Sequence, residues 1–148
     1  MNDVFIEQQI LEAVMKLLLG RVNDMLGVIE FPIPPIEFGK YSGYSVVAPV
    51  VSLALCERTE KERIIKIDTY SLTISFTLPE TPESELHCYA YVGVVEKALG
   101  ENPTLGGIAD RVIVTGKKYI PPKKPHCGQG WEVVLSLRVT VEGNNYAG

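Results

Sequence analysis

This sequence has no long apolar run, no basic leader and few cysteines. The 148 residues contain no uncharged apolar stretch of about 18 residues, the length that a membrane-spanning helix needs. The chain begins Met-Asn-Asp rather than with basic residues, so we expect no signal peptide. Three cysteines are a sparse, odd count, which predicts reduced thiols in a cytosol. The formal charge of −4 disfavours a general nucleic-acid binder, whose domains are usually basic.

Motifs for catalysis are also missing. There is no serine elbow, no phosphate-binding loop and no carboxylate pair with a specific spacing. His87-Cys88 and His126-Cys127 do not have zinc-site spacing, because zinc ligands are usually separated by two to four residues. We therefore expect no metal, no cofactor and no enzymatic activity. A small thiol enzyme that uses Cys88 or Cys127 with a histidine is the alternative.

The length predicts one domain, residues 1–148. It divides into an N-terminal helical segment (1–27), a Pro-rich connector (28–44), a core (45–142) and a loose tail (143–148). Within it, hydrophobic periodicity predicts the order α-β-β-α-β-β. Each β-β pair is adjacent in sequence, so we expect two hairpins in an antiparallel sheet with the helices packed on it, an α+β fold.

The front half of the chain predicts one helix and two strands. The helix is expected from Asp3 to Leu19, with Gly20 as one possible end. Val22, Met25 and Leu26 allow one or two further helical turns before Gly27. Val46 to Cys56 is apolar on both faces, which is typical of a central, doubly covered strand. The charged run Glu57 to Arg63 is then a solvated hairpin tip. In the second strand, Ile64 to Leu78, the alternation changes phase near Asp68-Thr69, which predicts a bulge or a bend there.

The back half predicts a helix and a second hairpin. Thr81-Pro82 is a strong helix start, and the helix should run to about Leu99. Gly93, in its middle, is expected to mark close approach to the sheet. The strands are expected at Arg111–Thr115 and Trp131–Val141, with Lys117–Gly130 as a long polar loop between them.

The stretch Asn102-Pro-Thr-Leu-Gly-Gly-Ile-Ala-Asp110 stands between this helix and the second hairpin. Its proline and its two glycines predict a turn that sits close against another part of the protein. The residues that define it are Thr104, Leu105, Gly106, Gly107 and Asp110. Asp110 is expected to hydrogen-bond or cap the turn. Downstream, Trp131 should open the last strand and be half buried.

Four lysines, Lys117, Lys118, Lys123 and Lys124, surround Tyr119-Ile-Pro-Pro122. Lysines beside a tyrosine could contact a phosphate backbone. A solvated hairpin tip is the plainer interpretation, because lysine is common there. A third is a docking arm that meets an acidic protein surface or nearby DNA.

The order of elements and the turn together resemble the tail-terminator, or tail-completion, minor tail proteins of long-tailed bacteriophages and prophages. The resemblance covers roughly residues 45–142, and the N-terminal helix also suits it. It depends on Pro79 closing a long strand, on Tyr89, Tyr91 and Val92 in the following helix, on Asn102–Asp110, and on the last strand that Trp131 opens. Its sharpest motif is Thr104-Leu105-Gly106-Gly107 with Asp110.

The resemblance implies a small non-enzymatic α+β subunit that closes with its own copies into a hexameric ring. The ring caps the finished tail tube and joins it to the head–neck assembly. The implied partners are other copies, the tail tube protein, neck or connector proteins, and DNA in the lumen, with no membrane. The implied location is the bacterial host cytoplasm during assembly and then the virion tail.

The four lysines are expected to face either the lumen or the adjoining ring. The alternatives for the chain are another neck or baseplate component of the tail, or a small nucleic-acid-binding module that uses Lys117–Lys124.

Overall fold

The computed structural model describes residues 5–62, 65–124 and 128–144. The elements in chain order are α1 (Ile6–Leu17), the π-helical η1 (Leu18–Val22), α2 (Asn23–Leu26), β1 (Val50–Lys61), β2 (Ile65–Pro79), α3 (Ser84–Glu101), β3 (Arg111–Ile120) and β4 (Gln129–Asn144). The predicted α+β class is therefore confirmed. None of the described helices is both long and apolar enough to cross a membrane.

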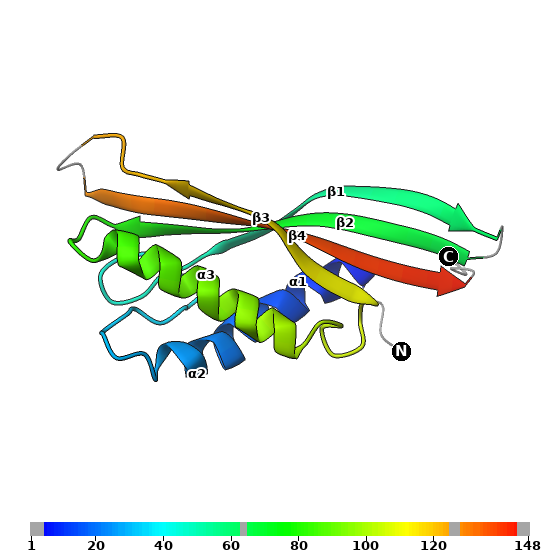
Figure 1. Cartoon of the computed structure of the whole chain (residues 1–148), viewed down its shortest axis with the longest axis horizontal. Helices are drawn as coiled ribbons and strands as arrows, with labels where there is room; N and C mark the ends of the chain where they lie inside the picture. The colour runs from blue at the N-terminus through cyan, green and yellow to red at the C-terminus, as the bar shows by residue number, and fades with distance from the viewer. Residues whose placement is uncertain (1–4, 63–64, 125–127, 145–148) are drawn as a thin grey trace.

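The four strands form one antiparallel sheet in the order β1-β2-β4-β3. Each predicted hairpin is present, and β2 and β4 join the two hairpins side by side in the centre. The strand order therefore differs from the chain order, and it places β1 and β3 at the two edges. All the described helices lie on one side of the sheet (Figure 1), so none of them covers the opposite side.

The core lies between the helices and the inward side of the two central strands. In β2 and β4, apolar side chains alternate with polar ones, and the apolar sets face each other across the pairing. The buried members are Tyr70, Leu72, Ile74 and Phe76 on β2, and Val133, Leu135, Leu137 and Val139 on β4. From α3, the ring of Tyr91 stacks on Phe76 with centroids 5.0 Å apart.

Of the two ends that the sequence allows for the first helix, Gly20 is wrong and the continuation toward Gly27 is confirmed. The chain stays helical through η1 and α2 to Leu26, with one π turn around Gly20. A single glycine weakens a helix by only about 1 kcal/mol. Burial of Leu18 and Val22 against the core outweighs that effect. The predicted start at Asp3 lies outside the described residues.

The Pro-rich connector runs without regular structure between α2 and β1. A single parallel bridge joins Ile36 to Val47. The side chain of Asn23 fixes the connector from α2: its Nδ2 donates to the Ile36 carbonyl at 2.9 Å, and its Oδ1 accepts from the Ile36 N–H at 2.8 Å. On the other side the Tyr91 hydroxyl donates to the Pro34 carbonyl. These bonds hold a segment that cannot form a ladder of its own.

The prediction of a central first strand that ends at Cys56 is wrong. β1 runs from Val50 through most of the charged run to Lys61, and it is an edge strand. The pairing register shifts between Leu53 and Leu55. This bulge leaves Leu53 on the helix side and turns Leu55 to the uncovered side, where it is 51% exposed. Apolar residues therefore occur on both faces of β1 because a bulge exchanges the faces, not because both faces are covered.

Of the bulge or bend predicted near Asp68, the bulge is absent. The β1–β2 and β2–β4 registers continue without a shift through Asp68, which occupies the inward position that follows in phase from Tyr70. Its side chain is buried and forms an ion pair with Arg58 on β1. A charged residue can hold a core position when its partner supplies the hydrogen bonds that water would give. The alternation therefore continues unchanged through Asp68, with a charged residue in a buried position.

In α3, the predicted role of Gly93 is wrong. α3 begins at Ser84, three residues after Thr81, and ends at Glu101. Gly93 faces solvent, and nothing lies within 4 Å of a Cβ built on it. The glycine that does mark a close approach is Gly130, where a Cβ would collide with the Ser84 hydroxyl and the Pro79 carbonyl.

The predicted polar loop from Lys117 to Gly130 is too long. β3 continues to Ile120 and β4 begins at Gln129, so Lys117 and Lys118 are strand residues. Lysine is compatible with an edge strand, where it faces water and discourages unwanted pairing. The predicted loose tail starts too early, because β4 extends to Asn144; residues 145–148 lie outside the described part of the chain.

Candidate interaction surfaces

The turn between α3 and β3 depends on backbone conformations that favour glycine. Leu105, Gly106 and Gly107 have φ values of 51, 74 and 93°. The Asn102 Oδ1 accepts from the Gly106 N–H at 2.9 Å, and the Thr104 Oγ1 accepts from the Gly107 N–H at 3.2 Å. Nothing lies within 4 Å of a Cβ built on either glycine. The glycines are therefore required for their φ values. The turn itself sits close against the core, as predicted, through the buried side chains of Leu105 and Ala109.

Asp110 ties the turn to β4 instead of capping it. Its carboxylate accepts from the Glu142 N–H, and its own N–H donates to the Thr140 carbonyl at 2.8 Å. A further bond joins the Val112 N–H to the Pro103 carbonyl at 2.8 Å. The turn thus fixes where β3 begins alongside the end of β4.

The same turn forms one wall of a groove against the first helical segment. The groove has a volume of about 570 Å³. Leu105, Gly106 and Ile108 contribute from the turn, and Ala13 and Leu17 from α1. A bidentate ion pair between Arg21 and Glu101, with the closer contact at 2.8 Å, joins η1 to the end of α3 beside this groove. The structure therefore brings together the turn and the N-terminal helix.

Trp131 lies far from the turn. It is half buried against the core, as predicted, and its N–H donates to the Ser84 Oγ at 2.9 Å. Asp110, in contrast, bonds to β4 at Thr140 and Glu142. At about 3.4 Å per residue, the nine positions from Trp131 to Thr140 correspond to about 30 Å along the strand. The two parts of the sequence motif thus stabilise opposite ends of β4.

The four lysines do not form one loop. Lys117 Nζ donates to Glu96 Oε1 on α3 at 2.9 Å, whereas Lys118 faces the uncovered side of the sheet. Lys123 and Lys124 follow β3 and are exposed. The segment is nonetheless strongly basic: five of the 14 Lys and Arg residues lie in residues 111–124, which contain no Asp or Glu. The rest of the chain contains the other nine Lys and Arg residues and all 18 Asp and Glu residues.

The histidine and cysteine residues do not form a site in the described part of the chain. Burial raises the pKa of the Cys88 thiol to about 12, the opposite of what an activated nucleophile needs. The ring of His87 stacks on Phe31 with centroids 5.9 Å apart. No group of three metal-binding side chains occurs among the described residues. His126 and Cys127 lie outside them.

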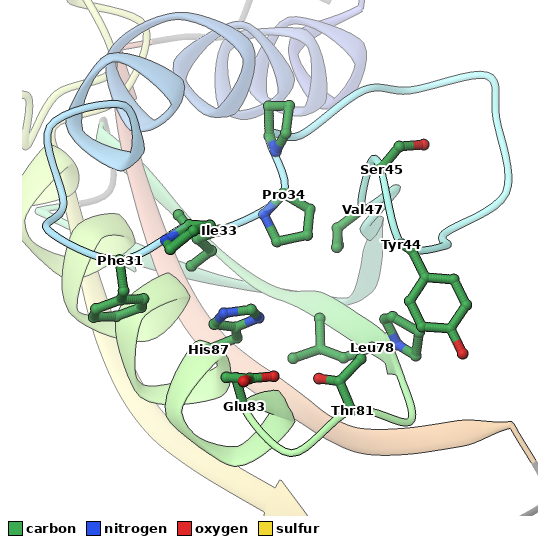
Figure 2. Close-up of a pocket in the computed structure, with 13 residues that line it drawn as sticks. Phe31, Ile33, Pro34, Tyr44, Ser45, Val47, Leu78, Thr81, Glu83 and His87 are labelled. Carbon is green, nitrogen blue, oxygen red and sulfur yellow. The ribbon is translucent and has the colours of Figure 1, made fainter.

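A cavity of about 580 Å³ opens where the connector crosses the end of β2 and the start of α3. Figure 2 shows the rings of Phe31 and His87 on one side and Tyr44 on the other. The lining is mostly apolar, with Thr81 and Glu83 among its few polar side chains. Such a cavity suits an apolar side chain of a partner or a small ligand. Sequence reasoning missed it, because nothing in the pattern shows how a connector folds.

No protein-family model matches this sequence, and no curated protein matches it either. The surfaces of the molecule and the residues of the turn therefore carry the functional argument.

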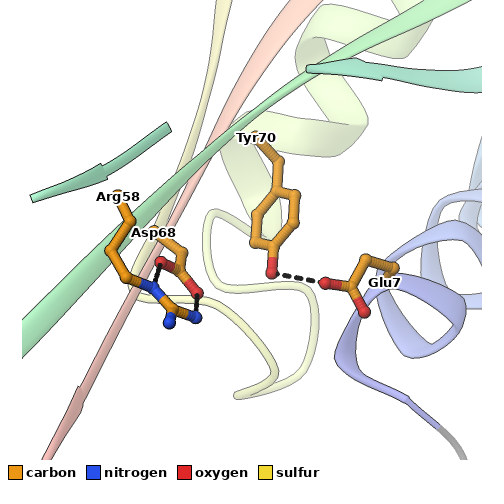
Figure 3. A network of polar contacts seen from close by, with 4 residues as sticks. All are labelled: Glu7, Arg58, Asp68 and Tyr70. Atoms are coloured by element: carbon orange, nitrogen blue, oxygen red, sulfur yellow. Dashed lines mark hydrogen bonds and ion pairs between the residues drawn. The ribbon is translucent and has the colours of Figure 1, made fainter. Parts of the chain in front are cut away.

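A second feature that sequence reasoning missed is a polar network beneath β1 (Figure 3). Arg58 donates two hydrogen bonds to Asp68, at 2.6 and 2.9 Å, and the Tyr70 hydroxyl donates to Glu7 Oε2 at 2.8 Å. The bonds from Arg58 hold the pKa of Asp68 below its usual value. Burial, followed by the bond to Glu7, raises the pKa of Tyr70. The network fastens α1 and β1 to the centre of the sheet.

The two edges of the sheet complete the candidate surfaces. Within the described residues, β1 pairs with β2 alone and β3 pairs with β4 alone. Val50 and Leu55, on β1, are 63% and 51% exposed. Long strand edges with exposed apolar side chains are ready to pair with another chain. The two edges are therefore candidate sites for pairing with another chain.

Proposed function

We propose that this chain is a non-enzymatic structural subunit of a bacteriophage or prophage tail, similar to the tail terminators. In this role, copies of the chain close into a ring that caps the finished tail tube and joins it to the head–neck assembly. A hexamer is the expected ring.

The observation that carries the proposal is the stretch Asn102–Asp110 in its place within the fold. It lies between a long helix and the last hairpin of an α-β-β-α-β-β chain, and Trp131 follows near the start of the final strand. In the structure it is a tight turn that anchors β3 on β4. The residues on which the resemblance depends therefore include those that fix the position of β3 on β4.

The surfaces of the molecule suit a ring subunit. Every member of a cyclic ring needs two different, mutually complementary surfaces, because each copy contacts its two neighbours differently. Here the sheet has two unlike edges, and a basic segment, residues 111–124, stands against an otherwise acidic chain. A protein with this charge distribution can attract a second copy of itself.

The test is to measure assembly and then tube capping. Light scattering across a concentration series gives the mass, and negative-stain imaging shows whether a ring with a central hole forms. Tail tubes assembled from the tube protein of the same phage or prophage are then mixed with the chain. We expect rings, and we expect bound protein at the tube ends that stops elongation. Tubes that grow unchanged in excess protein, with nothing bound at their ends, would exclude the terminator role.

The basic segment favours one second candidate, a small nucleic-acid-binding module. Lys118, Lys123 and Lys124 are exposed, and the segment has no acidic residue to weaken attraction to phosphate. Lys117 is engaged with Glu96, so it contributes less. A DNA titration at several salt concentrations separates the candidates. Tight binding by the monomer that falls steeply with salt would favour the module.

The position of the lysines inside a tail is part of the proposal. We expect Lys117, Lys118, Lys123 and Lys124 to face the ring lumen or the adjoining ring. Reversing all four charges should then impair assembly or infectivity. If both are unchanged, the lysines have neither role.

A further inference from the structure

The directions of the two edge strands allow copies of the sheet to add head to tail. All neighbouring strands in the order β1-β2-β4-β3 are antiparallel, so β1 and β3 also run in opposite directions. A second copy placed with its β1 beside β3 therefore continues the antiparallel sheet. The same step can be repeated, because the second copy again offers its own β3. An interface of this kind is heterologous and can close into a ring.

The pairing registers also show which residues would meet. Through their partners on β2 and β4, Leu55 shares a row with Ile113, and Glu57 shares a row with Arg111. If the rows continue into the next copy, Ile113 of one copy meets Leu55 of the next, and Arg111 meets Glu57. Residues directly opposite each other in an antiparallel pair lie on the same side of the sheet and interact. Both pairs lie on the uncovered side.

The bulges of the two edges fit the same arrangement. The register shifts between Leu53 and Leu55 on β1, and between Val114 and Gly116 on β3. Leu53 and Val114 share one row, so both bulges adjoin that row. Each bulge adds one residue to its own strand. The rows of β1 and β3 therefore stay matched on both sides of the row that holds Leu53 and Val114. The kinks of the two edges therefore lie at the same level.

The chemistry of these two pairs is complementary. Leu55 is half exposed in the single copy, and pairing with Ile113 would cover it. Glu57 and Arg111 have opposite charges, and both are exposed. Pairing would also satisfy the backbone donors and acceptors that an edge strand leaves to water.

We propose that β1 of one copy pairs with β3 of the next copy in the register that continues the rows of the sheet. This seam joins Leu55 to Ile113 and Glu57 to Arg111. It rests on the proposed function, since it names the contact between neighbours in the ring. It also places the start of the basic segment, at Arg111, against a second copy of the chain rather than against DNA.

The test reverses one charge at a time on each edge. Glu57→Arg and Arg111→Glu each place like charges opposite each other at the seam. For each seam, we expect either substitution to raise the protein concentration at half-assembly about three- to tenfold. The double variant Glu57→Arg/Arg111→Glu restores the opposite charges and should assemble at the wild-type concentration.

A mixture of the two single variants gives the sharpest readout. Each variant alone has like charges at position 57 and position 111, so its own copies repel at the seam. In an equimolar mixture, alternating copies place opposite charges at every seam, and assembly should be restored. Matched controls are Glu30→Arg and Lys97→Glu, which make the same charge changes at exposed positions away from both edges. The controls should assemble like the wild type, and all variants should melt near the wild-type temperature.

Four outcomes would overturn the seam. If neither Glu57→Arg nor Arg111→Glu changes assembly, the contact between copies lies elsewhere, and the proposed ring and tail function are unaffected. Dimers that respond only to Glu57→Arg indicate β1 paired with β1. Loss of DNA binding in Arg111→Glu with unchanged assembly assigns the basic edge to nucleic acid. A wild-type chain that stays monomeric at every concentration excludes the seam directly. Conversely, seams that form in a protein that never binds tail tubes would refute the tail function alone.

Discussion

Gly93 and Gly107 are predicted to respond in opposite directions to substitution by alanine. Gly107 lies in the turn before β3 with a φ of 93°, a conformation that residues with a Cβ rarely adopt. Gly93 lies in α3, faces solvent, and has nothing within 4 Å of a built Cβ. Neither substitution creates a collision, so the backbone alone decides the change in the free energy of unfolding.

The magnitudes follow from the two conformations. A left-handed conformation is unfavourable by roughly 1–2 kcal/mol for an ordinary L-residue. The smaller entropy of the unfolded alanine chain offsets about 0.4–1 kcal/mol of this. Gly107→Ala should therefore lower the free energy of unfolding by about 1 kcal/mol. Gly93→Ala should raise it by about 0.5–1 kcal/mol, because alanine is the better helix former.

The two variants should differ by about 2 kcal/mol, which corresponds to roughly 4–8 °C in melting temperature for a domain of this size. Urea unfolding followed by circular dichroism measures the difference, at a protein concentration where the wild type is monomeric. The slope of the transition should not change. A Gly107→Ala variant as stable as the wild type would refute the left-handed turn. A destabilised Gly93→Ala variant would show that this side of α3 packs against something in solution.

Three further predictions concern stability and reactivity. Gly130→Ala should destabilise the fold by about 2–3 kcal/mol, because its Cβ would collide with neighbouring backbone; an unchanged melting temperature would contradict this. Asp68→Asn should cost about 1–3 kcal/mol at neutral pH through the weakened pair with Arg58. Since the folded pKa of Asp68 is lowered, the stabilisation is complete above the unfolded value of about 4 and is lost as pH falls through the folded pKa, so the difference between the wild type and Asp68→Asn should shrink below about pH 4. Maleimide labelling with peptide mapping should modify Cys56 in the folded protein and Cys88 only after unfolding; rapid modification of Cys88 would contradict its burial.

The sequence predicts well those parts of the fold in which a given hydrophobic pattern arises from only one kind of environment. Alternation in β2 and β4 is regular because one side of the sheet is covered and the other is not. Both hairpins follow from strands that are adjacent in the sequence. The overall α+β class needs no more information than this.

The sequence could not predict the edge position of β1, because one pattern has two physical origins. A strand apolar on both faces is either covered twice or interrupted by a bulge that exchanges its faces. Only the pairing register at Leu53 and Leu55 distinguishes them. The charged run after Cys56 was misread for a related reason, since an edge strand can remain in a ladder while both of its sides are charged.

The functional residues show a similar division between signal and role. The turn Asn102–Asp110 and Trp131 are conspicuous in sequence because they require particular residue types, yet each holds β4 in place at a different end. The seam that we propose uses Leu55, Glu57 and their row partners, which belong to no motif. Substitutions in the turn should therefore reduce stability and assembly together. Substitutions at the seam should reduce assembly alone, and measuring both quantities on the same variants distinguishes residues that build the subunit from residues that join one subunit to the next.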